Sequence, residues 1–206
     1  GKIEIDFDGG GSESRQFVRM RHAYLQASWT RVTFLVGQTW DIISPLFPTV
    51  NTATLMWNAG NLGDRRPQVR VTYASPDGAG AQVTLVGGVM LNGAVALQDL
   101  DGNDVRDGEA SGRPMLQGRA GVAVPIGDAS RVSVGVSGHH AREEVGASIQ
   151  GQTQFDSWSM SVDYDVQVNA RVSVRGEIWT GRNLNDVRGG IAQGVNTATG
   201  RGIESR

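Results

Sequence analysis

Arginine is the residue type in this sequence best suited to binding a solute, and many arginines alternate with apolar residues. The 206-residue chain has 19 basic residues, of which Lys2 is the only lysine. A guanidinium group offers a planar set of N–H donors that matches a carboxylate or a phosphate. Eight arginines are the candidate anion-binding residues: Arg19, Arg21, Arg65, Arg66, Arg70, Arg119, Arg171 and Arg175.

A second interpretation of these arginines stays open. Acidic residues occupy similar alternating segments, at Glu4, Asp6, Asp163 and Glu177. Oppositely charged residues on neighbouring strands pair with one another. Arginines paired in this way would keep one face of the strands hydrated but would not select a solute.

No combination of residues in the sequence indicates an enzyme. The chain has no cysteine, no Gly-x-Ser-x-Gly elbow and no phosphate-binding loop, and its glycines do not form a dinucleotide fingerprint. His139 and His140 lie near Glu143 and Glu144, but neighbouring residues of a strand point to opposite faces and do not readily share one metal ion. We therefore expect no catalysis, no metal site at these residues and no cofactor.

The loop at 98–113 is acidic and partly resembles a calcium-binding loop. Counted from Asp99, the sixth position is Asp104 and the twelfth is Ala110, where a calcium loop requires Gly and Glu. The mismatch favours a solvated acidic loop, and calcium binding is left open.

The elements that must position the arginines are strands, because apolar and polar residues alternate in most segments. The segment from Trp158 to Asp165 is the clearest example. Such a period of two sends successive side chains to opposite faces of a sheet. About nine segments follow this pattern, at 2–8, 17–29, 32–37, 67–74, 81–97, 116–125, 131–137, 155–165 and 171–178.

Connections between these segments alternate in length. Short reversals are expected at 29–31, 75–78, 126–130 and 166–169, and long loops at 9–16, 41–66, 98–114, 143–151 and 181–202. In an antiparallel up-and-down sheet, successive connections lie alternately at the two ends of the strands. Short turns at one end and long loops at the other are typical of a transmembrane β-barrel. A soluble β-sandwich or jelly roll is the alternative.

Composition is compatible with a barrel and argues against two other classes. No run of about 18 apolar residues is present, whereas a barrel strand needs only about 9–11 residues with half of them facing lipid. The net charge of −2 gives no general attraction to nucleic acid. If the valines and other apolar residues face lipid, the arginines on the opposite face line the lumen.

The segment 41–66 breaks the strand pattern. It contains Pro45, Pro48, Gly60 and Gly63 together with many apolar residues. Loops of this length are usually functional or disordered. We expect it to fold into the lumen as a constriction loop; the alternative is a surface loop that covers a neighbouring subunit.

Three segments resemble the DcaP-like outer-membrane porins of Gram-negative bacteria. They are Arg19-Met20-Arg21-His22-Ala23-Tyr24-Leu25, Leu35-Val36-Gly37-Gln38-Thr39-Trp40 and Gly63-Asp64-Arg65-Arg66-Pro67-Gln68-Val69-Arg70. The resemblance is strongest over about residues 17–73. It implies an outer-membrane homotrimer of barrels, each of about sixteen strands, that lets small anionic solutes such as dicarboxylates diffuse. It also implies that 41–66 constricts the pore and that Arg19, Arg21, Arg65, Arg66 and Arg70 line it.

The chain is shorter than such porins, so we expect 1–206 to be one porin-type barrel domain truncated at both ends, an all-β partial barrel of about nine strands. The expected partners are small anionic solutes and outer-membrane lipid. Two alternatives stay open. One is a non-conducting outer-membrane barrel with adhesive loops. The other is a soluble β-sandwich that binds carbohydrate through loop residues such as Trp40, Trp57 and Asp101.

Overall fold

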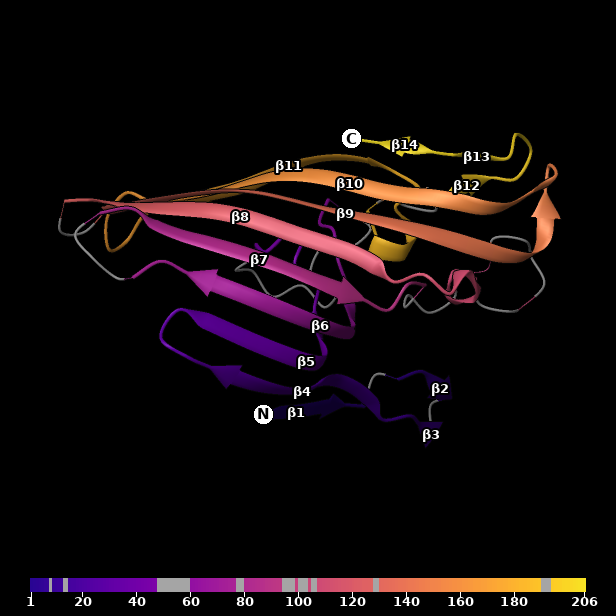
Figure 1. The fold of residues 1–206 in the computed structure, drawn as a ribbon, viewed down its shortest axis with the longest axis horizontal. Coiled ribbons are helices and arrows are strands. Elements are labelled where there is room, and N and C mark those ends of the chain that lie inside the picture. The colour runs from indigo at the N-terminus through magenta and orange to yellow at the C-terminus, as the bar shows by residue number, and fades with distance from the viewer. Residues whose placement is uncertain are drawn as a thin grey trace.

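The chain forms an all-β antiparallel sheet in which ten strands follow one another up and down (Figure 1). The computed structural model describes residues 1–7, 9–12, 15–47, 60–76, 80–93, 99, 104, 107–127, 130–189 and 194–206. The strands of the large sheet, in spatial order, are β1 (Lys2–Asp6), β4 (Arg19–Ser28), β5 (Val32–Trp40), β6 (Arg65–Ala74), β7 (Gln82–Met90), β8 (Met115–Ile126), β9 (Ser130–Ile149), β10 (Gln152–Gln167), β11 (Ser173–Arg182) and β14 (Glu204–Ser205).

Several small elements lie in the connections between the strands of the large sheet. Two short hairpins are formed by β2 (Gly11–Ser12) with β3 (Arg15–Gln16) and by β12 (Val195–Asn196) with β13 (Arg201–Gly202). Two single-turn 3-10 helices, η1 (Glu109–Ser111) and η2 (Asn185–Val187), lie in the long connections. No helix in the described part of the chain is long and apolar enough to cross a membrane.

Alternation along each strand gives the sheet two different faces. In β6, Val69 and Val71 are exposed on one face, while Gln68 and Arg70 lie on the other. Register carries this division across the sheet, because residues paired between antiparallel strands share a face. Arg119 in β8 pairs with Ser137 in β9, which pairs with Ser161 in β10. We call the side of Gln68, Arg119 and Ser137 the polar face and the opposite side the apolar face.

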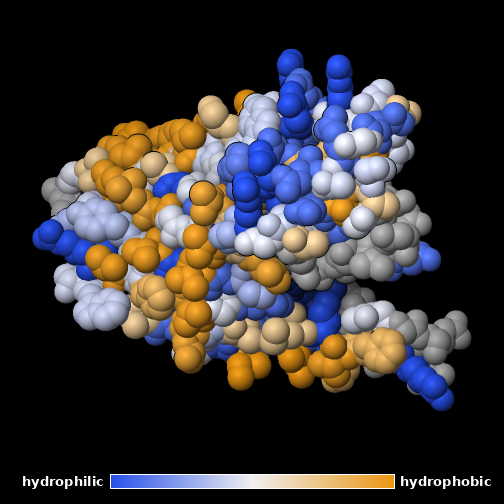
Figure 2. Space-filling view, turned by 45° about the vertical axis from the view of Figure 1, so that its right-hand side comes forward, coloured by the Kyte–Doolittle hydropathy of each residue, from blue (hydrophilic) through white to orange (hydrophobic). Residues whose placement is uncertain are grey.

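The apolar face is uncovered. Figure 2 shows hydrophobic side chains gathered in a broad band on one side of the molecule. Large apolar residues at least 38% exposed come from every strand from β5 to β11, and they include Val36, Val71, Val83, Leu85, Val122, Val136, Val162 and Val174. A soluble protein of this size rarely leaves so extended an apolar surface in water. The valines are not buried between two stacked sheets, as a β-sandwich would require.

The main hydrophobic cluster lies instead on the polar face, where long connections fold onto the sheet. Its buried members are Ile42, Ile43, Leu62, Met90, Met115, Ala141, Leu184 and Val187. Ile42, Ile43 and Leu62 come from the connection between β5 and β6, and Leu184 and Val187 from the one after β11. The core therefore holds these connections against the sheet.

The two ends of the sheet differ as expected, with one correction. Short connections at 29–31 and 168–172 lie at the end opposite the long connections (Figure 1). The expected long loop at 143–151 is wrong, because β9 continues to Ile149 and β10 begins at Gln152. Val145, Ile149 and Phe155 form a second buried cluster that stabilises this extended hairpin. The short reversals expected at 75–78 and 126–130 include residues outside the described ranges.

The sheet is open, with β1 at one edge and β14 at the other. The sequence predicted about nine strands, and the structure adds a tenth, β14, at the end of the chain. Closure into a barrel is not seen, so the barrel itself belongs to the proposal below.

Candidate functional site

The described ends of the predicted constriction loop lie on the polar face of the sheet. The backbone N–H of Ile42 donates to Gln117 Oε1 of β8 at 2.7 Å. Ser44 Oγ donates to Glu177 Oε1 of β11 at 2.7 Å. At the other end of the loop, Trp179 Nε1 of β11 donates to the carbonyl of Gly60 at 3.0 Å. The loop thus reaches across the polar face from β5 to β11; its residues 48–59 lie outside the described ranges.

The base of this loop is closed by Asp41 and Asp64. The Asp41 N–H donates to the Asp64 carbonyl, and the Asp64 N–H donates to Asp41 Oδ2, both at 2.8 Å. Arg188 Nε, from the connection after β11, donates to Asp64 Oδ2 at 3.0 Å. These contacts place the Asp41 carboxylate beside the first residues of β6.

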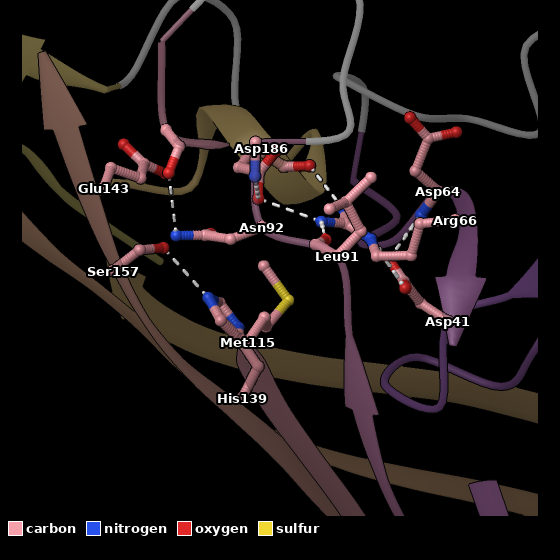
Figure 3. Close-up of polar contacts among 12 residues, drawn as sticks. Asp41, Asp64, Arg66, Leu91, Asn92, Met115, His139, Glu143, Ser157 and Asp186 are labelled. Atoms are coloured by element: carbon pink, nitrogen blue, oxygen red, sulfur yellow. Dashed lines mark hydrogen bonds and ion pairs between the residues drawn. The ribbon is translucent and has the colours of Figure 1, made fainter. Parts of the chain in front are cut away.

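Arg66 joins this base to two further connections (Figure 3). Its side chain is 0% exposed. Nε lies 2.9 Å from Asp41 Oδ1, Nη1 lies 2.9 Å from Asp186 Oδ2, and Nη2 donates to the Asp186 carbonyl at 2.7 Å. Nη1 also faces the Leu91 carbonyl at 3.4 Å. One guanidinium therefore ties together the connections that follow β5, β7 and β11.

A second set of polar contacts joins the connection after β11 to the sheet (Figure 3). Asn183 Nδ2 donates to Glu143 Oε2 at 2.9 Å, and Ser157 Oγ donates to the Asn183 carbonyl at 2.7 Å. His139 Nε2 lies 2.9 Å from the same Ser157 Oγ. Every one of these side chains is buried. Because buried polar groups need partners, this arrangement fixes one position of the connection after β11.

Asp41, which lies outside the strands, has a strongly raised pKa. Burial raises the pKa of its carboxyl to about 6, and the attraction of Arg66 offsets only part of that shift. Ionised Asp41 therefore depends on Arg66 at this position. The pair is a costly one to break, since either partner alone would leave a charge without compensation.

The structure corrects the expected exposure of Arg66. The sequence placed Arg66 among the arginines that face an open lumen, but the loop and η2 enclose it. Its partner Asp186 lies 120 positions along the chain, beyond the reach of any local pattern. Asp41 was visible as the first residue of the loop, and the flanking of that loop by Asp41 and Arg66 was the available signal.

Four other candidate arginines lie on the polar side and are paired with carboxylates. Arg19 contacts Asp6 at 2.7 Å, and Arg21 contacts Glu4 at 2.7 Å and Asp6 at 3.0 Å. Arg119 contacts Asp163 at 2.6 Å, and Arg175 contacts Asp165 at 3.2 Å. The second interpretation of the sequence, ion pairing across strands, therefore holds for these four arginines, although Arg175 pairs with Asp165 and the expected partner Glu177 accepts from Ser44 instead. The register between β1 and β4 shifts at Glu4 and Ile5, so that Arg21 is an extra residue of β4 without a register partner in β1, as in a β-bulge.

The remaining candidates differ from one another. The Arg65 guanidinium lies 4.8 Å above the ring of Trp40, a cation–π arrangement. Arg70 is half-buried on the polar face, beside Leu35 and Gly88 in the strand register. Arg171 is exposed in the turn between β10 and β11. Neither Arg70 nor Arg171 forms an ion pair with a carboxylate of the described residues.

The two metal hypotheses have different outcomes. His139 is buried and hydrogen-bonded to Ser157 and Ser159, whereas His140 is exposed on the apolar face. The two neighbouring histidines thus point to opposite faces, as strand geometry predicted. Among the residues that the structure describes, no group of three or more His, Asp or Glu side chains could hold a metal ion. Most of the acidic loop considered for calcium lies outside the described ranges. So do Trp57 and Asp101, two of the loop residues named for the carbohydrate-binding alternative.

Comparisons with protein-family models, with curated proteins and with solved structures found no match.

Proposed function

We propose that this sheet is part of a transmembrane β-barrel and that the chain acts as an outer-membrane porin for small hydrophilic anions. The observation that carries the proposal is the inverted use of the two faces. The apolar face is uncovered, whereas the polar face holds the chain's own loops and its main hydrophobic cluster. A sheet in water would do the reverse, but a barrel wall between lipid and a wet lumen has this arrangement.

The open edges set a condition on this proposal. Strand edges carry unpaired N–H and C=O groups, which cost several kcal/mol each in hydrocarbon. An open ten-stranded sheet is therefore not stable in a bilayer, and we propose that further strands join β1 and β14 to close the barrel. Porin-type barrels of larger strand number enclose a water-filled channel. The trimer and the outer-membrane location implied by the resemblance belong to this proposal.

The polar face suits anions because its cations are not fully neutralised. Arg70, Arg131 and Arg171 form no ion pair with a carboxylate of the described residues, and Arg131 donates only to the neutral side chain of Gln82. Loop 41–64, fixed by Arg66, would narrow the lumen. The arginines would attract anions, as rings of basic residues do in anion pores.

Arg70→Gln is expected to reduce anion selectivity. A unit positive charge about 8 Å away in water attracts a permeating chloride ion and repels a potassium ion by about 0.5 kcal/mol each, so its loss should lower the permeability ratio of chloride to potassium roughly sixfold. The measurement is the reversal potential of the complete protein in planar bilayers under a KCl gradient. Conduction with cation preference, or no conduction at all, would refute the proposed function.

The matched control removes a paired arginine without changing the net charge. Arg19→Gln combined with Asp6→Asn deletes the Arg19–Asp6 ion pair of β1 and β4, and Arg21, which also contacts Asp6, keeps its ion pair with Glu4. Selectivity should stay at the wild-type value in this double variant. If it changes as much as in Arg70→Gln, the assignment of Arg70 as a selectivity residue fails.

A further inference from the structure

A cationic hollow lies at the short-turn end of the polar face. It has a volume of about 420 Å³ and is formed by the ends of β9, β10 and β11 with the turn between the last two. We call it the basal pocket and define it by Arg131, Ser133, Asp165, Gln167, Arg171, Ser173 and Arg175. Small-molecule sites are typically clefts of about 300–1,000 Å³. The basal pocket is thus large enough for an organic metabolite.

Strand register places the basal pocket on the polar face. Asp165 pairs with Ser133 of β9 and with Arg175 of β11. In the next row towards the turn, Gln167 pairs with Arg131 and with Ser173. Paired residues share a face, so two adjacent rows of polar side chains point into one hollow. In the proposed barrel this is the lumen wall at the short-turn mouth.

The turn between β10 and β11 presents Arg171 in a defined position. Asn169 Oδ1 accepts the N–H groups of Arg171 at 2.8 Å and of Val172 at 3.0 Å. The Val168 N–H donates to the Val172 carbonyl at 3.0 Å and closes the turn. An asparagine side chain that caps a turn in this way fixes its backbone. The backbone of Arg171 is therefore held at the rim of the hollow by local contacts, while its side chain is exposed.

The charges that line the basal pocket do not balance. Three arginines face a single carboxylate, Asp165, which lies 3.2 Å from Arg175. Arg131 donates to the neutral Gln82 Oε1 at 2.8 Å. Three positive charges and one negative charge leave a net charge of +2 among the described lining residues. Serine and glutamine side chains add neutral hydrogen-bond donors.

We propose that the basal pocket binds a small organic dianion, with Arg131 and Arg171 as its principal charged ligands. The net charge of +2 matches two carboxylates, and the volume exceeds that of a compact inorganic ion. A guanidinium binds a carboxylate through paired hydrogen bonds. The proposal rests on the proposed function in one respect, that such a solute reaches the site through the lumen.

The test is isothermal titration calorimetry of the complete protein in detergent, with succinate as the probe. Succinate should bind, and the double variant Arg131→Gln/Arg171→Gln should bind it about tenfold more weakly, since two charge-assisted contacts are lost. Butyrate, a monoanion, should bind more weakly than succinate to the wild type. Far-UV circular dichroism verifies that the variants are folded, and Arg171→Gln alone, at an exposed turn position, serves if the double variant does not fold.

Arg31→Gln is the matched control, because Arg31 is an exposed arginine in another short turn at the same end of the sheet. It removes the same charge outside the pocket and should leave succinate affinity unchanged. No succinate binding by the wild type, unchanged affinity in the double variant, or sulfate binding as tightly as succinate would each overturn the proposal. Calorimetry needs no conduction, so these outcomes are distinct from failure of the porin function in planar bilayers.

Discussion

Val71→Arg is expected to lower the free energy of unfolding in lipid vesicles by about 2–4 kcal/mol, the cost of arginine on the lipid side near the bilayer midplane. Val71 lies in the middle of β6 and is 46% exposed on the apolar face. Its register partners are Phe34 of β5 and Gly87 of β7, so neither directly paired neighbour offers a charge to the new guanidinium. Guanidinium chloride titration of the vesicle-bound protein measures the change.

The neighbouring residue supplies the control for this prediction. Thr72 is half-buried and points to the polar face, which already carries Arg70 two positions earlier. Thr72→Arg should cost less than about 1 kcal/mol, because lumen positions of a barrel tolerate charge. Equal effects of the two substitutions would mean that the two faces do not meet different solvents.

Arg66→Met is expected to destabilise the protein by about 3–5 kcal/mol. The substitution leaves the buried carboxylates of Asp41 and Asp186 without the cation that compensates them. It also frees the three connections that the guanidinium joins. If loop 41–64 narrows the lumen, the folded fraction of this variant should conduct more current per channel than the wild type.

An exposed ion pair controls for the loss of an arginine. Arg142 contacts Asp156 at 2.7 Å, with 34% and 48% of the two side chains exposed. Arg142→Met should cost less than about 1 kcal/mol, as exposed pairs usually do. A cost for Arg66→Met no larger than that for Arg142→Met would show that the buried network does not hold the loops.

The sequence predicted which segments form strands and on which face of the sheet each side chain lies, because alternation with a period of two is a local pattern. Residues 67–74 were expected as a strand with Arg70 opposite Val69 and Val71, and β6 contains them in that arrangement. The phase of Arg119 and Arg175 was also correct. These features depend on neighbours in sequence, which a single chain displays directly.

The loop expected at 143–151 shows where local reading fails. Glu143, Glu144 and Gly146 interrupt the alternation, yet the segment pairs with β10 up to Ile149. Its stability comes from tertiary contacts, since Val145 and Ile149 pack on Phe155 and Val195. Such packing overrides weak local propensity and leaves little trace in the segment itself.

The carboxylate with which each arginine pairs was harder to predict than the face of the sheet on which the arginine lies. Whether an arginine binds solvent or a carboxylate depends on which strands adjoin and in what register. Arg119 meets Asp163 across β9, and Arg66 meets Asp186 through a loop, at separations of 44 and 120 residues. Arg131 was not among the candidate arginines, because the basal pocket that it lines forms only when three strands and a turn come together.

The central claim is that one face of the sheet contacts lipid and the other contacts water, and spin labels on β7 test it most directly. The chain has no cysteine, so single cysteines at Gln82, Val83, Thr84 and Leu85 would label one site each. In vesicles, labels at Val83 and Leu85 should meet oxygen dissolved in lipid, and those at Gln82 and Thr84 a water-soluble nickel complex. Uniform accessibility along the four positions, or exclusion of oxygen from Val83 and Leu85, would contradict the claim.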